Sequence, residues 1–317
     1  MNNLNFIEPQ VSSITLNNGV IIPQVGLGTF LIPKEKVVDT IGTAFSLGYR
    51  QYDTAWRYHN ENEISLALKK FKIPREQVFV TTKVNADALY FSRYHGGPLK
   101  FLNIRIKSIR KAVEESFKNL GFDYIDLFLV HTPWPMYLQM YEVLSDFYYQ
   151  GRIRAIGVSS FLPPMIASLK EVSDVIPAVN QFEISPLNTQ KPLIKWCQDR
   201  GIAVEAMSTF SHFRSNEPRL EIIDNPDLKE IAETHGKTVV QVVLRWLLQQ
   251  DIILIPKTWN LEHLKENIDI FDFTLSEVEV KRIDALDKGR FLNYNPYGLL
   301  VNVPKIYRNW NGFEISL

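Results

Sequence analysis

The sequence has little of several features that mark other classes of protein. Its 317 residues include a single cysteine, Cys197, so no disulfide can form within the chain. Lysine plus arginine equals aspartate plus glutamate, 35 of each, and the formal net charge is zero. Without a basic excess or a basic tract, electrostatics gives no reason to expect binding to nucleic acid or to an anionic membrane.

Long apolar runs and metal-binding spacings are missing as well. No stretch approaches the roughly 18 apolar residues of a membrane span, and the opening MNNLNFIEPQ lacks the apolar core of a signal peptide. The six histidines form neither H-x-H nor H-E-x-x-H, so we expect no metal site. The lone cysteine is compatible with a reducing compartment. We expect a cytoplasmic protein that is a monomer or a weak oligomer.

What the chain does contain is a regular alternation of short apolar runs and amphipathic helical patterns. Most of the runs are nearly continuous in hydrophobicity, which is typical of parallel strands covered on both faces. The eight strand candidates are residues 25–30, 49–55, 78–84, 124–131, 154–160, 177–184, 202–208 and 252–258.

Helical patterns, such as those over 37–49 and 60–71, separate these runs with no break in composition. Eight such units favour a (β/α)8 TIM barrel, and we predict one domain over residues 1–317. A doubly wound dehydrogenase fold is less favoured, because it needs an early G-x-G-x-x-G turn and the stretch GLGTF lacks one.

Three segments fall outside the eight units. Residues 13–22 predict a β-hairpin with Asn-Gly at its turn. Residues 85–104 form a long stretch after the third strand, and residues 288–317 form a long C-terminal loop. Long aperiodic loops in compact folds are usually functional or disordered. The aromatic residues of the tail argue against disorder: Phe291, Tyr294, Tyr297, Tyr307, Trp310 and Phe313.

Ionisable residues gather at the expected ends of neighbouring strands, where barrels of this kind place their active sites. The second run closes near Asp53, the third near Lys83 and the fourth at His131, while Tyr58 follows in the loop after Asp53. Free tyrosine has a pKa of about 10. A neighbouring lysine cation lowers the pKa of a phenol, and a carboxylate holds the lysine charged. We therefore predict a tuned acid beside an imidazole that polarises a carbonyl.

Several longer motifs then identify the chain as resembling the aldo-keto reductase superfamily. The resemblance runs nearly end to end, through LNNGVIIPQVGLGTF, GYRQYDTAWRYHNE, TTKV, YIDLFLVH, RIRAIGVSSF, VNQFEISP and IPKTWNLEHLKEN. It implies NADPH-dependent reduction of an aldehyde or ketone to an alcohol by hydride transfer. It also implies Tyr58 as the general acid, Lys83 and Asp53 as the residues that tune it, and His131 as the residue that orients the carbonyl.

The resemblance also implies a cofactor site, with three departures from the family pattern. Ser160 stands in place of an asparagine, Met207 in place of an aromatic residue that stacks on nicotinamide, and His263 in place of an arginine. A thioether still packs against a ring, but neutral histidine gives up a charge, so NADH becomes possible beside the NADPH that Lys257 favours. The matching positions are Gly28, Thr29, Asp53, Ser159, Ser160, Asn180, Gln181, Met207, Ser208, Phe210, Lys257, Thr258, His263, Glu266 and Asn267.

Phe30, Arg57 and Trp134 are the candidates for the substrate wall. Arg57 stands where the family usually has a small or apolar residue, so we hypothesise a carbonyl substrate that bears a carboxylate or phosphate. Two other functions stay open from the residues alone. One is an aldolase barrel in which Lys83 forms a Schiff base. The other is a barrel that binds NADPH as a regulatory or accessory subunit without turnover.

Overall fold

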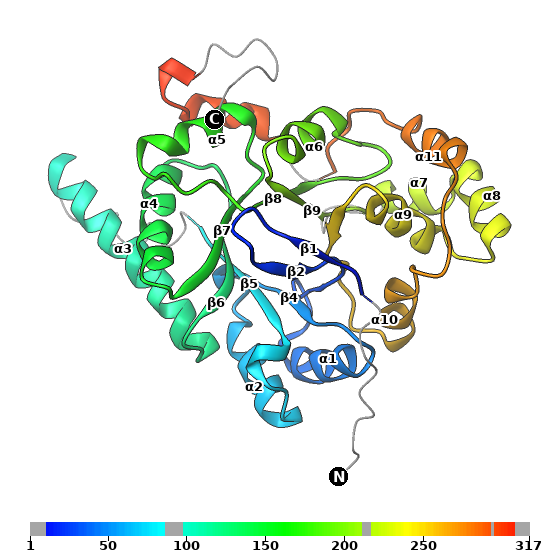
Figure 1. Cartoon of the computed structure of the whole chain (residues 1–317), viewed down its shortest axis with the longest axis horizontal. Coiled ribbons are helices and arrows are strands. Elements are labelled where there is room, and N and C mark those ends of the chain that lie inside the picture. Colours follow the sequence, from blue (N-terminus) through cyan, green and yellow to red (C-terminus); the bar gives the residue numbers. More distant parts are fainter. Residues whose placement is uncertain (1–10, 86–97, 211–216, 293–294, 308–317) are drawn as a thin grey trace.

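A computed structural model describes residues 11–85, 98–210, 217–292 and 295–307, with backbone only for residues 98–107. Eight parallel strands form one sheet in the order β10-β9-β8-β7-β6-β5-β4-β3, and helices surround them (Figure 1). The strands are β3 (Leu27–Gly28), β4 (Gln51–Asp53), β5 (Phe79–Val84), β6 (Ile125–Val130), β7 (Ile153–Ser159), β8 (Val179–Glu183), β9 (Ala203–Met207) and β10 (Ile252–Leu254). All eight predicted strands are confirmed.

The first and last strands meet and close the sheet into a barrel. Val25 forms a parallel bridge with Leu254, and the Gly26 amide donates to the Leu254 carbonyl at 2.7 Å. Further along, the Gly28 amide donates to the Pro256 carbonyl at 3.3 Å. A Cβ at Gly28 would lie 2.7 Å from the Ile255 carbonyl oxygen, so only glycine lets the chains approach this closely.

The predicted hairpin is present and covers one end of the barrel. Strand β1 (Ser13–Thr15) pairs antiparallel with β2 (Ile21–Pro23), and Gly19 supplies the positive φ of the turn. The Asn17 and Asn18 side chains donate to the carbonyls of Pro177 and Arg154, at the start of β8 and of β7. The hairpin, which lies across the strands in Figure 1, thus covers their amino ends and leaves the carboxyl ends for a site.

Local signals fix where several helices begin and end. Helix α8 starts after Asn225, whose side chain accepts from the Leu228 amide, and stops at Gly236 with φ of 61°. Helix α9 starts at a capping box formed by Thr238 and Gln241. The eleven α-helices among the described residues are α1 (Lys34–Ser46), α2 (Glu61–Phe71), α3 (Pro98–Leu120), α4 (Tyr137–Tyr149), α5 (Pro163–Ala167), α6 (Lys191–Gln198), α7 (Glu217–Ile223), α8 (Pro226–His235), α9 (Val239–Leu248), α10 (Leu261–Ile268) and α11 (Glu277–Asp284).

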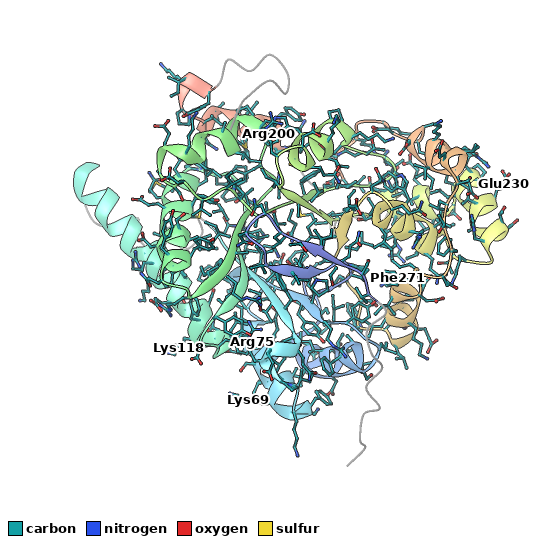
Figure 2. The ribbon with its side chains drawn as sticks, viewed as in Figure 1. Lys69, Arg75, Lys118, Arg200, Glu230 and Phe271 are labelled. Carbon is teal, nitrogen blue, oxygen red and sulfur yellow. The ribbon has the colours of Figure 1, made fainter. Side chains whose placement is uncertain are left out.

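The apolar core fills the layer between the barrel and these helices, where Trp246 of α9 and Phe45 of α1 are fully buried. Charged side chains such as Lys69, Lys118 and Glu230 lie at the rim of the molecule (Figure 2). No helix of the described residues is long and apolar enough to cross a membrane.

Two predicted boundaries differ from the structure. The helix expected over 37–49 begins at Lys34 and ends at Ser46. Pro33 precedes its first turn, and the Pro33 carbonyl accepts from the Lys36 amide. In the stretch 85–104, residues from Pro98 onward belong to α3, and residues 86–97 lie outside the described part of the chain.

The predicted C-terminal loop contains two short 3-10 helices, Pro296–Asn302 and Lys305–Tyr307. The Asn302 side chain donates to the Pro133 carbonyl at 3.2 Å, which places this segment beside the loop after β6. Three aromatic residues of the predicted loop, Tyr294, Trp310 and Phe313, lie outside the described residues.

Candidate active site

A cavity of about 1390 Å³ opens at the carboxyl ends of the strands. Most of the predicted site residues line it: Gly28, Phe30, Asp53, Arg57, Tyr58, His131, Trp134, Ser159, Ser160, Gln181, Met207, Ser208, Phe210, Lys257, His263, Glu266 and Asn267. Four others do not, namely Thr29, Lys83, Asn180 and Thr258. Thr29 donates to the Asp53 carbonyl, and Thr258 accepts from the Asn260 amide just before α10. The Asn180 side chain turns away from the cavity and donates to the Phe161 carbonyl.

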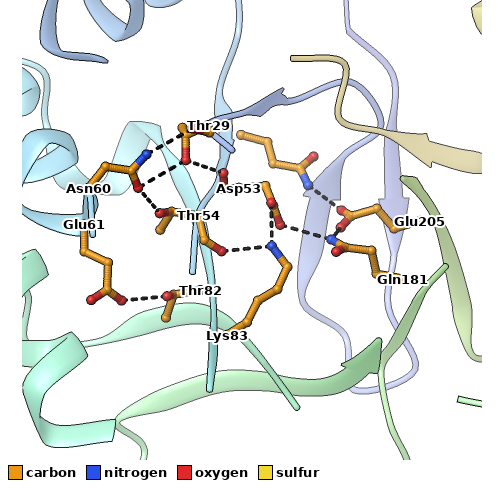
Figure 3. A network of polar contacts seen from close by, with 10 residues as sticks. Thr29, Asp53, Thr54, Asn60, Glu61, Thr82, Lys83, Gln181 and Glu205 are labelled. Carbon is orange, nitrogen blue, oxygen red and sulfur yellow. Dashed lines mark hydrogen bonds and ion pairs between the residues drawn. The ribbon is translucent and has the colours of Figure 1, made fainter. Parts of the chain in front are cut away.

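Lys83 and Asp53 form a buried ion pair below the cavity. The Lys83 Nζ donates to Asp53 Oδ1 at 2.5 Å and to the Thr54 carbonyl at 2.9 Å (Figure 3). Both side chains are almost completely buried. Asp53 opposes the effect of burial on the lysine, and the net result is a raised pKa for Lys83. The ammonium therefore stays charged, which does not suit a Schiff-base nucleophile.

Tyr58 lies directly above this pair. Its ring centroid is 5.1 Å from Lys83 Nζ and 5.8 Å from the centroid of His131, in an edge-on arrangement. The loop that carries Tyr58 is fixed by Asn60, whose side chain accepts from Thr54 Oγ1 at 2.6 Å and donates to the Thr29 carbonyl at 3.0 Å. The predicted meeting of acid, ammonium, imidazole and phenol is therefore present in the geometry.

The electrostatics of Tyr58 differ from the prediction. Burial raises the pKa of Tyr58, and the opposing effect of Lys83 does not overcome it, while Asp53 and Glu205 raise it further. The expectation that Lys83 brings the pKa of Tyr58 below the ordinary value is therefore wrong for this structure. The physical reason is that enclosure of the phenol disfavours the phenolate more strongly than one nearby cation stabilises it.

His131 is held in its neutral form. Burial lowers the pKa of His131 to about 3, and the positive charges of Lys83 and Arg57 add to this effect. The His131 Nδ1 is buried and has no hydrogen-bond partner among the described residues. A neutral imidazole has one N–H that can be donated to a carbonyl oxygen.

Sequence reasoning missed two residues below the cavity, Glu205 of β9 and Gln51 of β4. The Gln181 amide nitrogen donates both to Asp53 Oδ2, at 3.0 Å, and to Glu205 Oε1. The Gln51 amide nitrogen donates to Glu205 Oε2 at 2.8 Å. A signal was available, because Glu205 is a lone charged residue inside the apolar run IAVEAMS.

Known proteins that are similar in sequence and structure point to the same kind of site. Residues 24–288 match the model of the Aldo/keto reductase family. The chain belongs to this family. Morphine 6-dehydrogenase of Pseudomonas putida is 37% identical in an alignment of 293 positions that covers 89% of this chain and 94% of the relative. Glyoxal reductase of Bacillus subtilis is 36% identical over 291 residues, which are 91% and 97% of the two chains.

A solved structure agrees with these relatives. The aldo-keto reductase of Bombyx mori, crystallised in complex with NADP, superimposes with a TM-score of 0.77 at 32% identity, over 91% of this chain and 96% of that one. The predicted resemblance to aldo-keto reductases and the predicted barrel are thus confirmed.

The cavity of this aldo-keto reductase has features that suit a dinucleotide. Ser159 Oγ is buried at its wall without a hydrogen-bond partner among the described residues. Ser160 and Ser208, also at the wall, have φ of 62° and 55° in the left-handed region, and such local backbone strain clusters at ligand sites. These observations fit a ligand that supplies hydrogen-bonding groups along the strand ends.

Positive charge lies at the other end of the cavity. Lys257 and Arg219 both line it, and neither forms an ion pair within the described residues. Burial and the neighbouring Arg219 charge lower the pKa of Lys257. The Lys257 ammonium also lies 4.8 Å from the ring centroid of Trp259. Two adjacent cations without a carboxylate partner favour an anionic group such as phosphate. Among the described residues, no group of His, Cys, Asp and Glu side chains could hold a metal ion.

Proposed function

We propose that this chain reduces an aldehyde or a ketone to an alcohol with NADPH, and that Tyr58 is the general acid. The observation that carries this proposal is the buried Lys83–Asp53 pair beneath Tyr58, with neutral His131 beside it. Family membership supports it, since similar proteins are a glyoxal reductase of Bacillus subtilis and a methylglyoxal reductase of Escherichia coli O157:H7. Support for the cofactor comes from the similar Bombyx mori enzyme, which was crystallised with NADP.

The chemistry follows from the residues. When bound, NADPH supplies a hydride to the carbonyl carbon. The carbonyl oxygen lies between Tyr58 and His131, where the imidazole N–H donates to it and fixes its direction. Tyr58 gives its proton to this oxygen as negative charge develops, and the Lys83 ammonium stabilises the phenolate that remains. The raised pKa of Tyr58 keeps the proton on the phenol until the reaction begins, which suits reduction more than oxidation.

The cofactor residues divide along the cavity. Gln181, Ser159, Gly28, Asp53, Ser160 and Met207 would hold the nicotinamide at the reacting end, and Ser208 and Phe210 would follow toward the pyrophosphate. Thr29 and Asn180, which do not line the cavity, would act from behind this wall through their bonds to the Asp53 and Phe161 carbonyls. Glu266, Asn267 and His263 would hold the adenine. Lys257 and Arg219 would hold the phosphate on the adenosine ribose, and Thr258 would support this end from behind through its bond to the Asn260 amide. Because Arg219 provides a cation at the end where His263 lacks one, we propose a preference for NADPH over NADH.

For the substrate we propose a carbonyl compound that bears a carboxylate or phosphate, bounded by Phe30, Arg57 and Trp134. All three line the cavity beside Tyr58, and the charge of Arg57 already acts on His131. The test compares succinic semialdehyde with butanal. Arg57→Met should raise the KM of the anionic aldehyde about tenfold and leave that of butanal unchanged, while Arg57→Lys keeps part of the discrimination. Equal effects on the two aldehydes contradict this assignment.

The central test is steady-state turnover of aldehydes, ketones and keto acids with NADPH and NADH in parallel. We expect consumption of NADPH by the wild-type enzyme and its loss in Tyr58→Phe, with unchanged NADPH binding in a fluorescence titration. Binding without turnover of any carbonyl compound would favour the accessory function instead. We also propose a cytoplasmic enzyme, a monomer or a weak oligomer, to be checked by cell fractionation and by size-exclusion chromatography.

A further inference from the structure

Glu205 is a buried carboxyl group that the mechanism above does not use. Its side chain is 0% exposed, inside the barrel and below the cavity. Both of its hydrogen-bond donors are neutral amides, Gln51 from β4 and Gln181 from β8. Figure 3 shows Glu205 beside Gln181. Asp53, the other carboxyl group of the cluster, has the Lys83 ammonium at 2.5 Å. The two carboxyl groups therefore differ sharply in what compensates their charge.

A charge count of this cluster shows why the difference matters. The charged groups that act on Glu205 are Asp53 of β4 and Lys83 of β5. Asp53 and Lys83 neutralise each other, so an ionised Glu205 would leave one uncompensated negative charge in the barrel interior. An uncompensated charge is strongly unfavourable in a barrel interior, and a group in this position takes up a proton instead. Burial and the charge of Asp53 accordingly raise the pKa of Glu205 to about 7.

A second observation concerns the acceptor that a protonated Glu205 needs. The Gln51 Oε1 is buried and has no hydrogen-bond partner among the described residues. The two ends of a glutamine amide exchange places by a half-turn, which brings Oε1 to where the amide nitrogen now meets Glu205 Oε2. A neutral Glu205 can then donate to Gln51, while its other oxygen still accepts from Gln181. The cluster thus contains, in Gln51 Oε1, an acceptor for the proton of a neutral Glu205.

Gln181 connects this carboxyl group to the reacting end of the cavity. Its amide nitrogen is shared between Asp53 and Glu205, so its carbonyl oxygen is the end left for other partners. By holding the amide nitrogen, Glu205 helps to present the carbonyl oxygen of Gln181 to a bound ligand. Its charge also reaches Tyr58, because an ionised Glu205 raises the pKa of that phenol.

We propose that Glu205 is a positioning residue that carries a proton in the working enzyme: neutral, it orients Gln181 and leaves the Asp53–Lys83 pair balanced, and ionised, it adds a negative charge beneath Tyr58. The proposal rests on the proposed function, in which Tyr58 gives up the proton. It makes the behaviour of Tyr58 at alkaline pH depend on a group that no substrate touches.

The first test is the pH profile of kcat/KM for reduction of a neutral aldehyde, in wild-type enzyme and Glu205→Gln. Reduction fails at high pH when Tyr58 loses its proton. Glutamine keeps the shape of Glu205 but never carries its charge, so the alkaline limb should move to lower pH by about one unit, a tenfold loss at a fixed pH on that limb. The matched control is Glu61→Gln, which changes a carboxyl group that is also buried but is bonded to Thr82 and Asn119. Its alkaline limb should not move.

The second test does not depend on turnover or on bound cofactor. Infrared spectroscopy of the free protein detects the C=O stretch of protonated carboxyl groups. One such band should titrate near neutral pH in wild-type protein and in Glu61→Gln, and be absent from Glu205→Gln. An alkaline limb that stays in place in Glu205→Gln overturns the proposal. So does a wild-type spectrum without a band that titrates near neutrality, a result that holds even when Glu205→Gln does not fold. If the wild-type enzyme reduces no carbonyl compound, the proposed function fails, and the infrared titration still decides the state of Glu205.

Discussion

The raised pKa of Glu205 predicts a pH-dependent stability that can be measured without any substrate. In the folded protein the pKa of Glu205 is about 7, against an ordinary value of 4.5. The folded state binds this proton more tightly than the unfolded state. The stability that comes from this tighter proton binding is therefore fully present below the ordinary pKa of 4.5 and is lost as the pH rises through the pKa of Glu205 in the folded protein, about 7. One unit of pKa difference corresponds to 1.36 kcal/mol, so the free energy of unfolding of the wild-type protein should fall by about 3 kcal/mol relative to that of Glu205→Gln across this pH range.

Urea unfolding followed by circular dichroism at pH values from about 4.5 to 8 measures this loss. Other titrating groups are shared by wild type and Glu205→Gln, so the difference between their free energies of unfolding isolates the one carboxyl group. Glu142→Gln, at an exposed position of α4, is the control and should give a difference that does not change with pH. A constant difference for Glu205→Gln as well would refute the reasoning, because it would mean that Glu205 does not titrate in this window.

Three further predictions follow from the site and the barrel. Lys83→Met leaves Asp53 buried without its cation and should cost about 3–5 kcal/mol in urea unfolding, together with turnover; an unchanged unfolding midpoint contradicts this. Gly28→Ala puts a Cβ 2.7 Å from the Ile255 carbonyl oxygen and should cost about 1–3 kcal/mol, seen as a lower melting temperature. Arg219→Ala should weaken NADPH binding two- to fivefold, about 0.5–1 kcal/mol for an exposed charge, and leave NADH binding unchanged in fluorescence titrations; equal weakening of both cofactors argues against a phosphate contact.

The elements that the sequence predicted well are those with local causes. Parallel strands covered on both faces leave continuous apolar runs, so all eight were visible in order. The positions of Asp53, Lys83 and His131 followed from the rule that strand ends share one rim of a barrel. The Asn-Gly turn of the hairpin has equally local chemistry, since Gly19 adopts the positive φ that such turns need.

The features that the sequence did not predict depend on residues far apart in the chain. The pKa of Tyr58 is raised because the whole fold encloses it, and no pattern around residue 58 states how complete that enclosure is. Glu205 acquires its role from Gln51, which is 154 residues away, and from Gln181. Arg219 lies on a short helix with no recognisable motif, yet it lines the same cavity as Lys257.

The seam at which β3 meets β10 has a consequence for synthesis of the protein. The strand-closing hydrogen bonds join Gln24 and Gly26 to Leu254 of the last strand, so the emerging chain cannot form a closed ring until all eight barrel strands have left the ribosome. Contacts this distant in sequence form late and slowly. Lys257 lies just beyond the last strand, so the end of the cavity that we propose for the phosphate is completed only after all eight strands have emerged. A chain truncated before β10 should then be retained by chaperones, with an open sheet edge and no competence for the dinucleotide.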